Sequence, residues 1–259
     1  MLVSPLVRNV PYAVLIYGVE VWRPLDPQRR RVLERAAAVI SISEFTVKKA
    51  RETNPWLPET RVVWLGTDTH NDQTRQVTPI VLMLGRMAST ERYKGHDKLI
   101  DAWPRVVAAV PGAQAVIIGD GDDRARLEKR AHRIPSITFA GFLSDERVQT
   151  LLRSSAALVS ISSGEGFGLA ALEAAAAGTP VIALKGTVTE ELFPGGCGHV
   201  LLESLDADAL AKALVSLLIS SDRAQTIGSA GMRRVREMFT IEHFCQRLRT
   251  VLMPLLSAQ

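Results

Sequence analysis

Short apolar runs alternate with longer amphipathic patterns along most of this chain. The runs are rich in Val, Ile, Leu and Ala and end in polar or glycine residues, which is typical of buried strands. The predicted strands are 14–17, 39–42, 62–65, 80–84, 115–118, 137–140, 158–161, 181–183 and 200–202. The predicted helices are 28–37, 44–53, 96–109, 123–132, 145–153, 169–177, 207–218, 222–238 and 241–255. Apolar strands connected by helices indicate an α/β fold with a parallel sheet covered on both faces.

A polar stretch without periodicity, TDTHNDQTRQVT at residues 67–78, interrupts this alternation. The part after it has enough strands for a complete doubly wound domain, whereas the part before it is too short for an independent one. We therefore expect four segments. They are a partial first domain at 1–68, a linker at 69–78, a complete Rossmann-like domain at 79–240 and a C-terminal helix at 241–259.

Composition restricts the class of protein. The chain has 259 residues, of which 47% are hydrophobic and 22% charged, as in ordinary globular proteins. Cys197 and Cys245 lack metal-ligand spacing, which predicts a reducing compartment and no zinc site. The chain start lacks a signal-peptide pattern, and no apolar run is long enough to span a bilayer. These features predict a cytoplasmic protein.

Positive charge is concentrated early in the chain, although the net charge is only +4. The basic residues there are Arg29, Arg30, Arg31, Arg35, Lys48, Lys49 and Arg51. Such a cluster could meet anionic lipid at the inner face of a membrane, but a solvated helical face is the more ordinary interpretation. The chain lacks the aromatic-basic repeats typical of single-stranded nucleic acid binding, so we expect no nucleic acid partner.

The most informative motif is Ser-Ser-Gly-Glu-Gly-Phe-Gly-Leu-Ala-Ala-Leu-Glu at 162–173, between a predicted strand and a predicted helix. Its last residue, Glu173, is the one charged residue between Gly166 and Leu184. Burying a lone carboxylate is costly unless something donates hydrogen bonds to it, as ligand hydroxyls would. The glycines allow a backbone to approach a ligand, and the helix N-terminus offers N–H groups to an anion. The motif therefore predicts a site for a nucleotide or a nucleotide-sugar.

Polar residues follow other predicted strands, where open parallel sheets bind ligands. Gly85-Arg86 and Lys94 follow one strand and could hold a diphosphate, or could be solvated cations. Asp120-Gly-Asp122 could bind a divalent ion, but a glycine turn with Asp122 or Asp123 capping the next helix is favoured. The segment 141–143 could hydrogen-bond a base edge, with Ser144 as the next N-cap.

Other chemistries find little support. The sequence has neither a Gly-Lys-Ser/Thr phosphate loop nor a Gly-x-Ser-x-Gly elbow, and its histidines lack metal spacing. A dehydrogenase is disfavoured, because Gly164-Glu-Gly-Phe-Gly168 is not Gly-x-Gly-x-x-Gly and Glu173 follows it too closely.

Taken in order, these motifs resemble one known family. They are Gly85-Arg86, Tyr93-Lys-Gly95, Ile118-Gly-Asp-Gly121, Phe139-Ala-Gly-Phe142, Glu165-Gly-Phe-Gly-Leu169 with Glu173 eight positions on, and Gly178-Thr-Pro-Val-Ile182. Together they are similar to the retaining GT-B glycosyltransferases of group 1. The resemblance implies a GT-B fold, with a complete Rossmann-like donor domain, a remnant of the acceptor domain and a C-terminal helix that crosses back to that remnant.

The resemblance also implies roles for individual residues. Arg86 and Lys94 would neutralise the donor diphosphate in place of a metal, and Glu165 would sit beside the transferred sugar; these three form the implied catalytic set. Glu173 would bind the ribose hydroxyls, and 141–143 would frame the base. The implied donor-binding residues are Gly85, Arg86, Lys94, Gly119, Gly141, Phe142, Leu143, Glu165, Gly166, Phe167, Gly168, Leu169 and Glu173. No metal and no cofactor beyond the donor substrate is implied.

Two differences from the family pattern accompany the resemblance. The family's first domain normally begins with strands that this sequence lacks before position 14, which implies truncation at the N-terminus. Tyr17 stands where the family usually has a histidine near the reacting sugar. We therefore expect hexose transfer from a nucleoside diphosphate sugar to a glycan or lipid-linked hydroxyl with retention of configuration. The alternative is a non-catalytic binding module that needs a protein partner to supply the missing segment.

Overall fold

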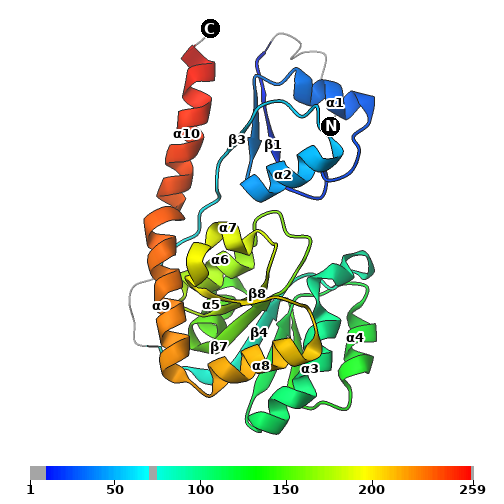
Figure 1. Ribbon diagram of the computed structural model, residues 1–259, viewed down its shortest axis with the longest axis vertical. Helices are drawn as coiled ribbons and strands as arrows, with labels where there is room; N and C mark the ends of the chain where they lie inside the picture. The colour runs from blue at the N-terminus through cyan, green and yellow to red at the C-terminus, as the bar shows by residue number, and fades with distance from the viewer. Residues whose placement is uncertain (1–9, 70–74, 258–259) are drawn as a thin grey trace. The chain divides into compact units, whose positions relative to one another are not determined.

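The computed structural model describes residues 10–69 and 75–257 (Figure 1). The chain divides into two compact units, which are described separately. Unit 1 contains residues 1–66, 165–167 and 239–259, and unit 2 contains residues 67–164 and 168–238. No described helix combines the length and the apolar character that a membrane crossing requires.

Unit 1 contains a small parallel sheet with the strand order β1-β2-β3. Its elements are β1 (Ala13–Ile16), α1 (Pro27–Glu34), β2 (Ala38–Ser41), α2 (Glu44–Thr53) and β3 (Thr60–Val62). Asp26 caps α1 by accepting from two backbone N–H groups, and Ser43 caps α2 by accepting from the N–H of Thr46. Both caps satisfy donors that a helix start leaves without intrahelical partners.

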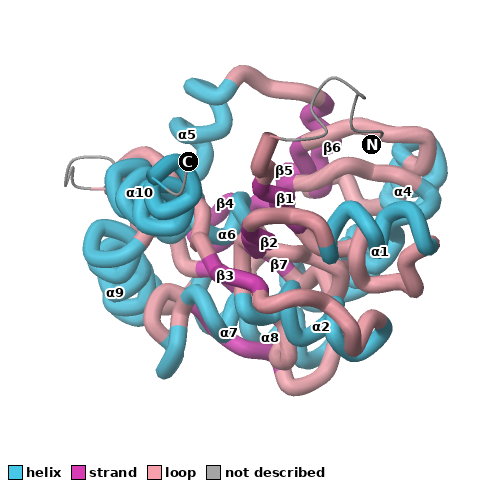
Figure 2. Tube along the Cα trace, turned by 90° about the horizontal axis from the view of Figure 1, so that it is seen from above, coloured by secondary structure: helices cyan, strands magenta, loops and turns pink. Residues whose placement is uncertain are grey.

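A helix from the far end of the sequence completes the core of unit 1. This helix, α10 (Ile241–Ser257), carries Phe244, Leu248, Val251 and Leu252 on one face. These side chains pack in one apolar cluster with Ile40 of β2 and with Val63, which follows β3. The strands are magenta and α10 is cyan in Figure 2. The sheet of unit 1 is therefore covered by residues more than 170 positions away along the chain.

Unit 2 is built on a six-stranded sheet in which every pair of neighbouring strands is parallel. Its strands are β4 (Thr78–Leu84), β5 (Gln114–Ile118), β6 (Ile137–Gly141), β7 (Ser155–Ser160), β8 (Val181–Leu184) and β9 (His199–Leu202). The α-helices are α3 (His96–Ala109), α4 (Arg124–Ala131), α5 (Asp145–Ser154), α6 (Leu169–Ala176), α7 (Thr189–Leu192), α8 (Ala207–Leu218) and α9 (Ser221–Met238). Two 3₁₀ segments are η2 (Ser89–Lys94) and η3 (Pro194–Gly196).

The strand order β6-β5-β4-β7-β8-β9 places the functional loops. Successive strands proceed outward from β4 in one direction and from β7 in the other, so the order reverses between β4 and β7. Ligands of doubly wound sheets bind beyond the carboxyl ends of strands at such a reversal. Side chains of α3, α4 and α8 share a buried cluster with the sheet, and α9 packs on α6 (Figure 1).

Some sequence-based assignments were wrong. The strand expected at 62–65 lies at Thr60–Val62, because these residues pair with β2. Val63 is apolar because it packs against α10 rather than because it belongs to the strand. The short α7 was not anticipated. Asp123 does not cap α4, because its carboxylate accepts from Arg126 instead. Ser144 does cap α5, as expected.

Candidate functional site

A cavity of about 620 Å³ lies at the carboxyl ends of β4 and β5 in unit 2. The residues that line it include Leu84, Gly85, Arg86, Gly119, Asp120 and Phe142. Phe142 is 83% exposed, so its ring can stack against a planar ligand. Residues that follow β4, β5 and β6 thus line one cavity.

The floor of this cavity depends on close contact between two loop backbones. Gly85 N donates to Ile118 O at the end of β5 (3.0 Å), and Gly119 N donates to Gly141 O (2.9 Å). Gly119 has a φ of +128°, and a Cβ there would overlap the carbonyl oxygen of Gly85. Only glycine combines this conformation with this approach. Gly119 is thus needed for the backbone of the site.

Two cations lie on the loop after β4. Arg86 forms an ion pair with Glu91 of the same loop, and its Nε donates to Glu91 Oε2 at 3.0 Å. The Arg86 side chain remains 68% exposed. The Cδ of Lys94 lies 3.4 Å from where a Cβ on Gly85 would stand. The loop therefore brings Arg86 to the lining of the cavity, and the aliphatic part of the Lys94 side chain lies beside Gly85.

His96 is a buried neighbour of Lys94 that sequence reasoning left unused. It begins α3 and is only 4% exposed, and its Nε2 has no hydrogen-bond partner among the described residues. Burial, followed by the positive charge of Lys94, lowers the pKa of His96 to about 4. The imidazole is therefore neutral at pH 7.

The helix α6 carries the one carboxylate of the motif that belongs to unit 2. Ala, Leu and Glu favour this helix, which ends with Gly178 at φ +73° and a Schellman pair of hydrogen bonds. No side chain caps its N-terminus at Gly168. Glu173 is half-buried, and no hydrogen bond or ion pair reaches its carboxylate from the residues that the structure describes. Burial, with a smaller contribution from Asp145, raises the pKa of Glu173.

Residues 165–167 belong to unit 1 by their contacts. Gly166 O accepts from Ser43 Oγ (2.6 Å) and from Thr46 Oγ1 (3.2 Å). Phe167 is 3% exposed, with its ring centroid 6.3 Å from that of Phe239. The side chain of Phe167 is therefore buried in unit 1, which leaves only its backbone as a candidate for the expected ligand contact.

The sequence did not reveal which side chains hold the loops after β4 and β5 in place. Glu91, which pairs with Arg86, and Ser89, which pairs with Asp122, carry no recognisable motif. A regular spacing could not have identified them, because their partners lie on loops. Among the described ranges, no group of three or more His, Cys, Asp or Glu side chains is arranged to hold a metal ion.

Known proteins share sequence similarity with this chain. A mannosyltransferase of Corynebacterium glutamicum, GDP-mannose-dependent and acting on monoacylated phosphatidylinositol monomannoside, is 32% identical over 184 residues. The alignment covers 68% of this chain and 47% of that protein, so the chain matches about half the length of this relative.

Solved structures share the fold. A glycosyltransferase from Rickettsia africae superposes with a TM-score of 0.79 at 20% identity, over 97% of this chain and 72% of that one. Sucrose-phosphate synthase from Thermosynechococcus elongatus gives 0.75 at 26% identity, over 89% and 61%. The expected fold class, GT-B with Rossmann-like α/β parts, is confirmed. The family model for glycosyl transferases group 1 matches residues 78–220, and this chain belongs to that family.

Proposed function

We propose that this chain binds a nucleoside diphosphate sugar and transfers its hexose to a hydroxyl of a glycan or lipid-linked acceptor, with retention of configuration. The observation that supports the proposal most strongly is the environment of Glu173. Its carboxylate is half-buried on an apolar helix, and no described residue donates to it. Removing a carboxylate from water without partners is costly, so a ligand that supplies them explains its presence. The two hydroxyls of a ribose fit a carboxylate with two oxygens.

The cations and the α6 N-terminus suit the rest of such a donor. Breaking the glycosidic bond leaves negative charge on the diphosphate, and donors already in position stabilise that charge. Arg86 can fork onto two phosphate oxygens, while Lys94 acts as a point charge. The uncapped N–H groups at Gly168 and Leu169 add further donors. In this proposal these groups neutralise the leaving diphosphate without a metal, and Glu165 adjoins the transferred sugar.

The relative from Corynebacterium glutamicum supports a choice of substrates for testing. Because that enzyme is GDP-mannose-dependent and acts on a phosphatidylinositol mannoside, GDP-mannose is the first donor to test and a lipid-linked polyol the first acceptor. An acceptor of this kind lies at a membrane surface. The arginines of α1, among them Arg29 and Arg31, would face its anionic lipids in the cytoplasm.

The test compares nucleotide binding with stability in the same variants. Binding of GDP, UDP and ADP is measured by calorimetry for the native chain, Glu173→Ala and Glu173→Gln. Both variants lose hydrogen bonds to a charged carboxylate, which are worth about 1.5–3 kcal/mol. Their affinity for the nucleotide should therefore fall about ten- to a hundredfold. The melting temperature without nucleotide should stay equal or rise, because an unpaired carboxylate is removed. The matched control is Glu146→Ala, which removes an exposed carboxylate from α5.

Unchanged nucleotide affinity in Glu173→Ala would contradict the assignment. Transfer of mannose from GDP-mannose, with the anomeric configuration of the product read by NMR, tests the enzymatic part. Nucleotide binding without transfer or donor hydrolysis would instead support the alternative, a binding module that depends on a partner.

A further inference from the structure

The turn after β5, residues 119–123, holds the loop after β4 through side chains as well as backbone. The Oδ1 of Asp122 accepts from Ser89 N at 2.9 Å, and its Oδ2 accepts from Ser89 Oγ at 2.5 Å. Ser89 is the first residue of η2, and Lys94 is the last. These hydrogen bonds lower the pKa of Asp122, so its carboxylate is charged at neutral pH. Asp122 therefore fixes the start of the segment that ends at Lys94.

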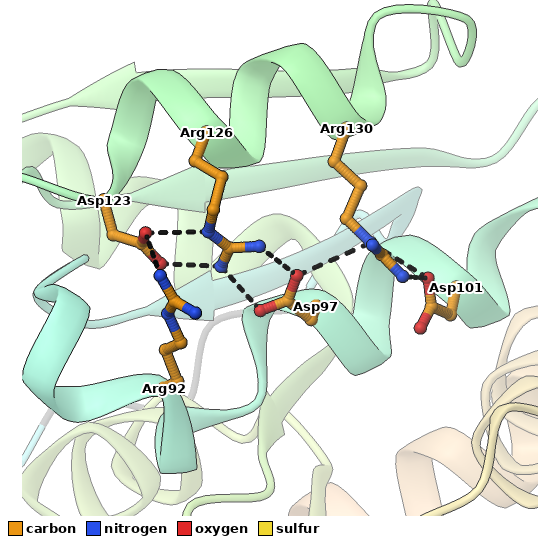
Figure 3. A network of polar contacts seen from close by, with 6 residues as sticks. All are labelled: Arg92, Asp97, Asp101, Asp123, Arg126 and Arg130. Atoms are coloured by element: carbon orange, nitrogen blue, oxygen red, sulfur yellow. Dashed lines mark hydrogen bonds and ion pairs between the residues drawn. The ribbon is translucent and has the colours of Figure 1, made fainter.

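The neighbouring carboxylate reaches the other end of the same segment. Figure 3 shows Asp123 between two guanidinium groups. Arg126 of α4 donates to it twice, at 2.7 and 2.6 Å, and Arg92 of η2 donates to it at 3.3 Å. The Asp123 side chain is only 6% exposed, whereas the side chain of Arg92 beside it is 56% exposed. Arg92 lies two positions before Lys94.

A row of ion pairs anchors Asp123 to the helices behind it. Arg126 also binds Asp97 of α3 with two hydrogen bonds of 2.7 Å. One turn further along α4, Arg130 binds Asp101 at 2.6 Å (Figure 3). Several charges that share partners hold their geometry better than an isolated exposed pair does. The turn is thus a firm support rather than a second mobile loop.

Backbone hydrogen bonds also join the turn at 119–123 to Met87, the residue after Arg86. Met87 N donates to Asp120 O at 2.9 Å, and Asp123 N donates to Met87 O at 2.9 Å. A Cβ on Gly121 would overlap the carbonyl oxygen of Met87, so the two backbones lie too close for a larger residue. The residue next to Arg86 is therefore fixed by the same turn.

We propose that Asp122 and Asp123 are positioning residues, which clamp residues 87–92 and so hold Arg86 and Lys94 ready for a nucleoside diphosphate. This inference rests on the proposed function of the site. Without these contacts, residues 87–92 would become ordered only when the ligand binds. The entropic cost of this ordering would lower the affinity for the phosphates. Of the two aspartates in the candidate metal motif, Asp120 accepts from Arg124 and Asp122 accepts from Ser89.

The test is a double-mutant cycle on Ser89 and Asp122. GDP, UDP and their nucleosides are titrated into the native chain, Ser89→Ala, Asp122→Ala and the double variant. For the diphosphate that binds, each single variant should lose about five- to thirtyfold in affinity, and the nucleoside less than twofold. The double variant should lose no more than Asp122→Ala, because Ser89→Ala removes only the Oγ contact, which Asp122→Ala removes as well. Ser89→Thr keeps the hydroxyl and should bind like the native chain.

A structural readout and a control accompany the titrations. Amide hydrogen exchange at residues 87–94 should accelerate in Asp122→Ala without nucleotide. Lys185→Ala breaks an exposed 2.8 Å ion pair with Glu203 elsewhere in unit 2 and should change neither exchange nor binding. Equal losses for diphosphate and nucleoside, or no loss in Asp122→Ala, would overturn the clamp alone. A native chain that binds no nucleotide would overturn the proposed function and the clamp together.

Discussion

The guanidinium of Arg75 donates a 2.6 Å hydrogen bond to the carbonyl oxygen of Ser155, the first residue of β7. The same group donates to the carbonyl oxygens of Arg153, Leu152 and Gly178 and to the hydroxyl of Thr179. Burial lowers the pKa of Arg75 to about 10. Arg75 thus joins the end of α5, the start of β7 and the end of α6 through oxygen atoms that would otherwise be hard to satisfy.

Replacing Arg75 should destabilise unit 2 strongly. Arg75→Ala leaves several backbone carbonyls without their donor, and we expect the free energy of unfolding to fall by about 3–5 kcal/mol. Arg75→Lys should show a large part of the same decrease in the free energy of unfolding, because an ammonium group cannot reach all of these acceptors at once. Urea denaturation followed by circular dichroism measures both. Arg105→Ala, which breaks an exposed ion pair with Asp208, should cost at most about 1 kcal/mol; a similar cost for Arg75→Ala would contradict the expectation.

Acid should destabilise the fold through His96. Its pKa is about 4 in the folded chain and 6.5 ordinarily, so below pH 6.5 the unfolded chain takes up a proton that the folded chain does not. The free energy of unfolding therefore falls as the pH drops from 6.5 to 4, by about 3 kcal/mol from this residue. Urea titrations across this range should show a shallower fall for His96→Leu. His132→Leu, at an exposed position, should follow the native curve; parallel curves for all three chains would refute the assignment.

Gly228 of α9 should tolerate no side chain. A Cβ there would overlap the carbonyl oxygen of Gly178, where α9 packs on the end of α6. Gly228→Ala should therefore lower the free energy of unfolding by about 1–3 kcal/mol, despite the better helix propensity of alanine. Gly112→Ala meets nothing within 4 Å and should be nearly neutral. Thermal denaturation of the two variants measures this difference. Equal melting temperatures would contradict the prediction, because they would show that α9 can shift away from the end of α6.

The sequence predicted what depends on local pattern. The strands of unit 2 are continuous apolar runs, and a helix that ends in Gly178 is visible because its glycine has a local conformational cause. Arg75 was not predictable, because most of its acceptors are main-chain oxygens 77–103 residues away. Asn54 is similar: it is 1% exposed and binds Leu25 N, Val21 O and Arg23 O, but it looks like a loop asparagine.

In the candidate site, too, the residues that follow a local pattern were predictable and the long-range partners were not. Gly85, Gly119 and Phe142 were predictable as lining residues, since strand ends meet at one edge of a parallel sheet. The partners of Asp122 and Asp123 were not, because capping and ion pairing use the same side chains and only the loop conformation decides between them.

The packing of α10 on β2 and β3 has a consequence for how the chain acquires its structure. The apolar cluster with Ile40 and Val63 needs Phe244 and Val251, which a ribosome adds long after those strands. Unit 2 spans residues that are synthesised before α10, so it can fold while the strands of unit 1 still lack this cover. We therefore expect unit 2 to form first during translation, and a nascent chain stopped near residue 238 to expose the apolar side of β2 to chaperones.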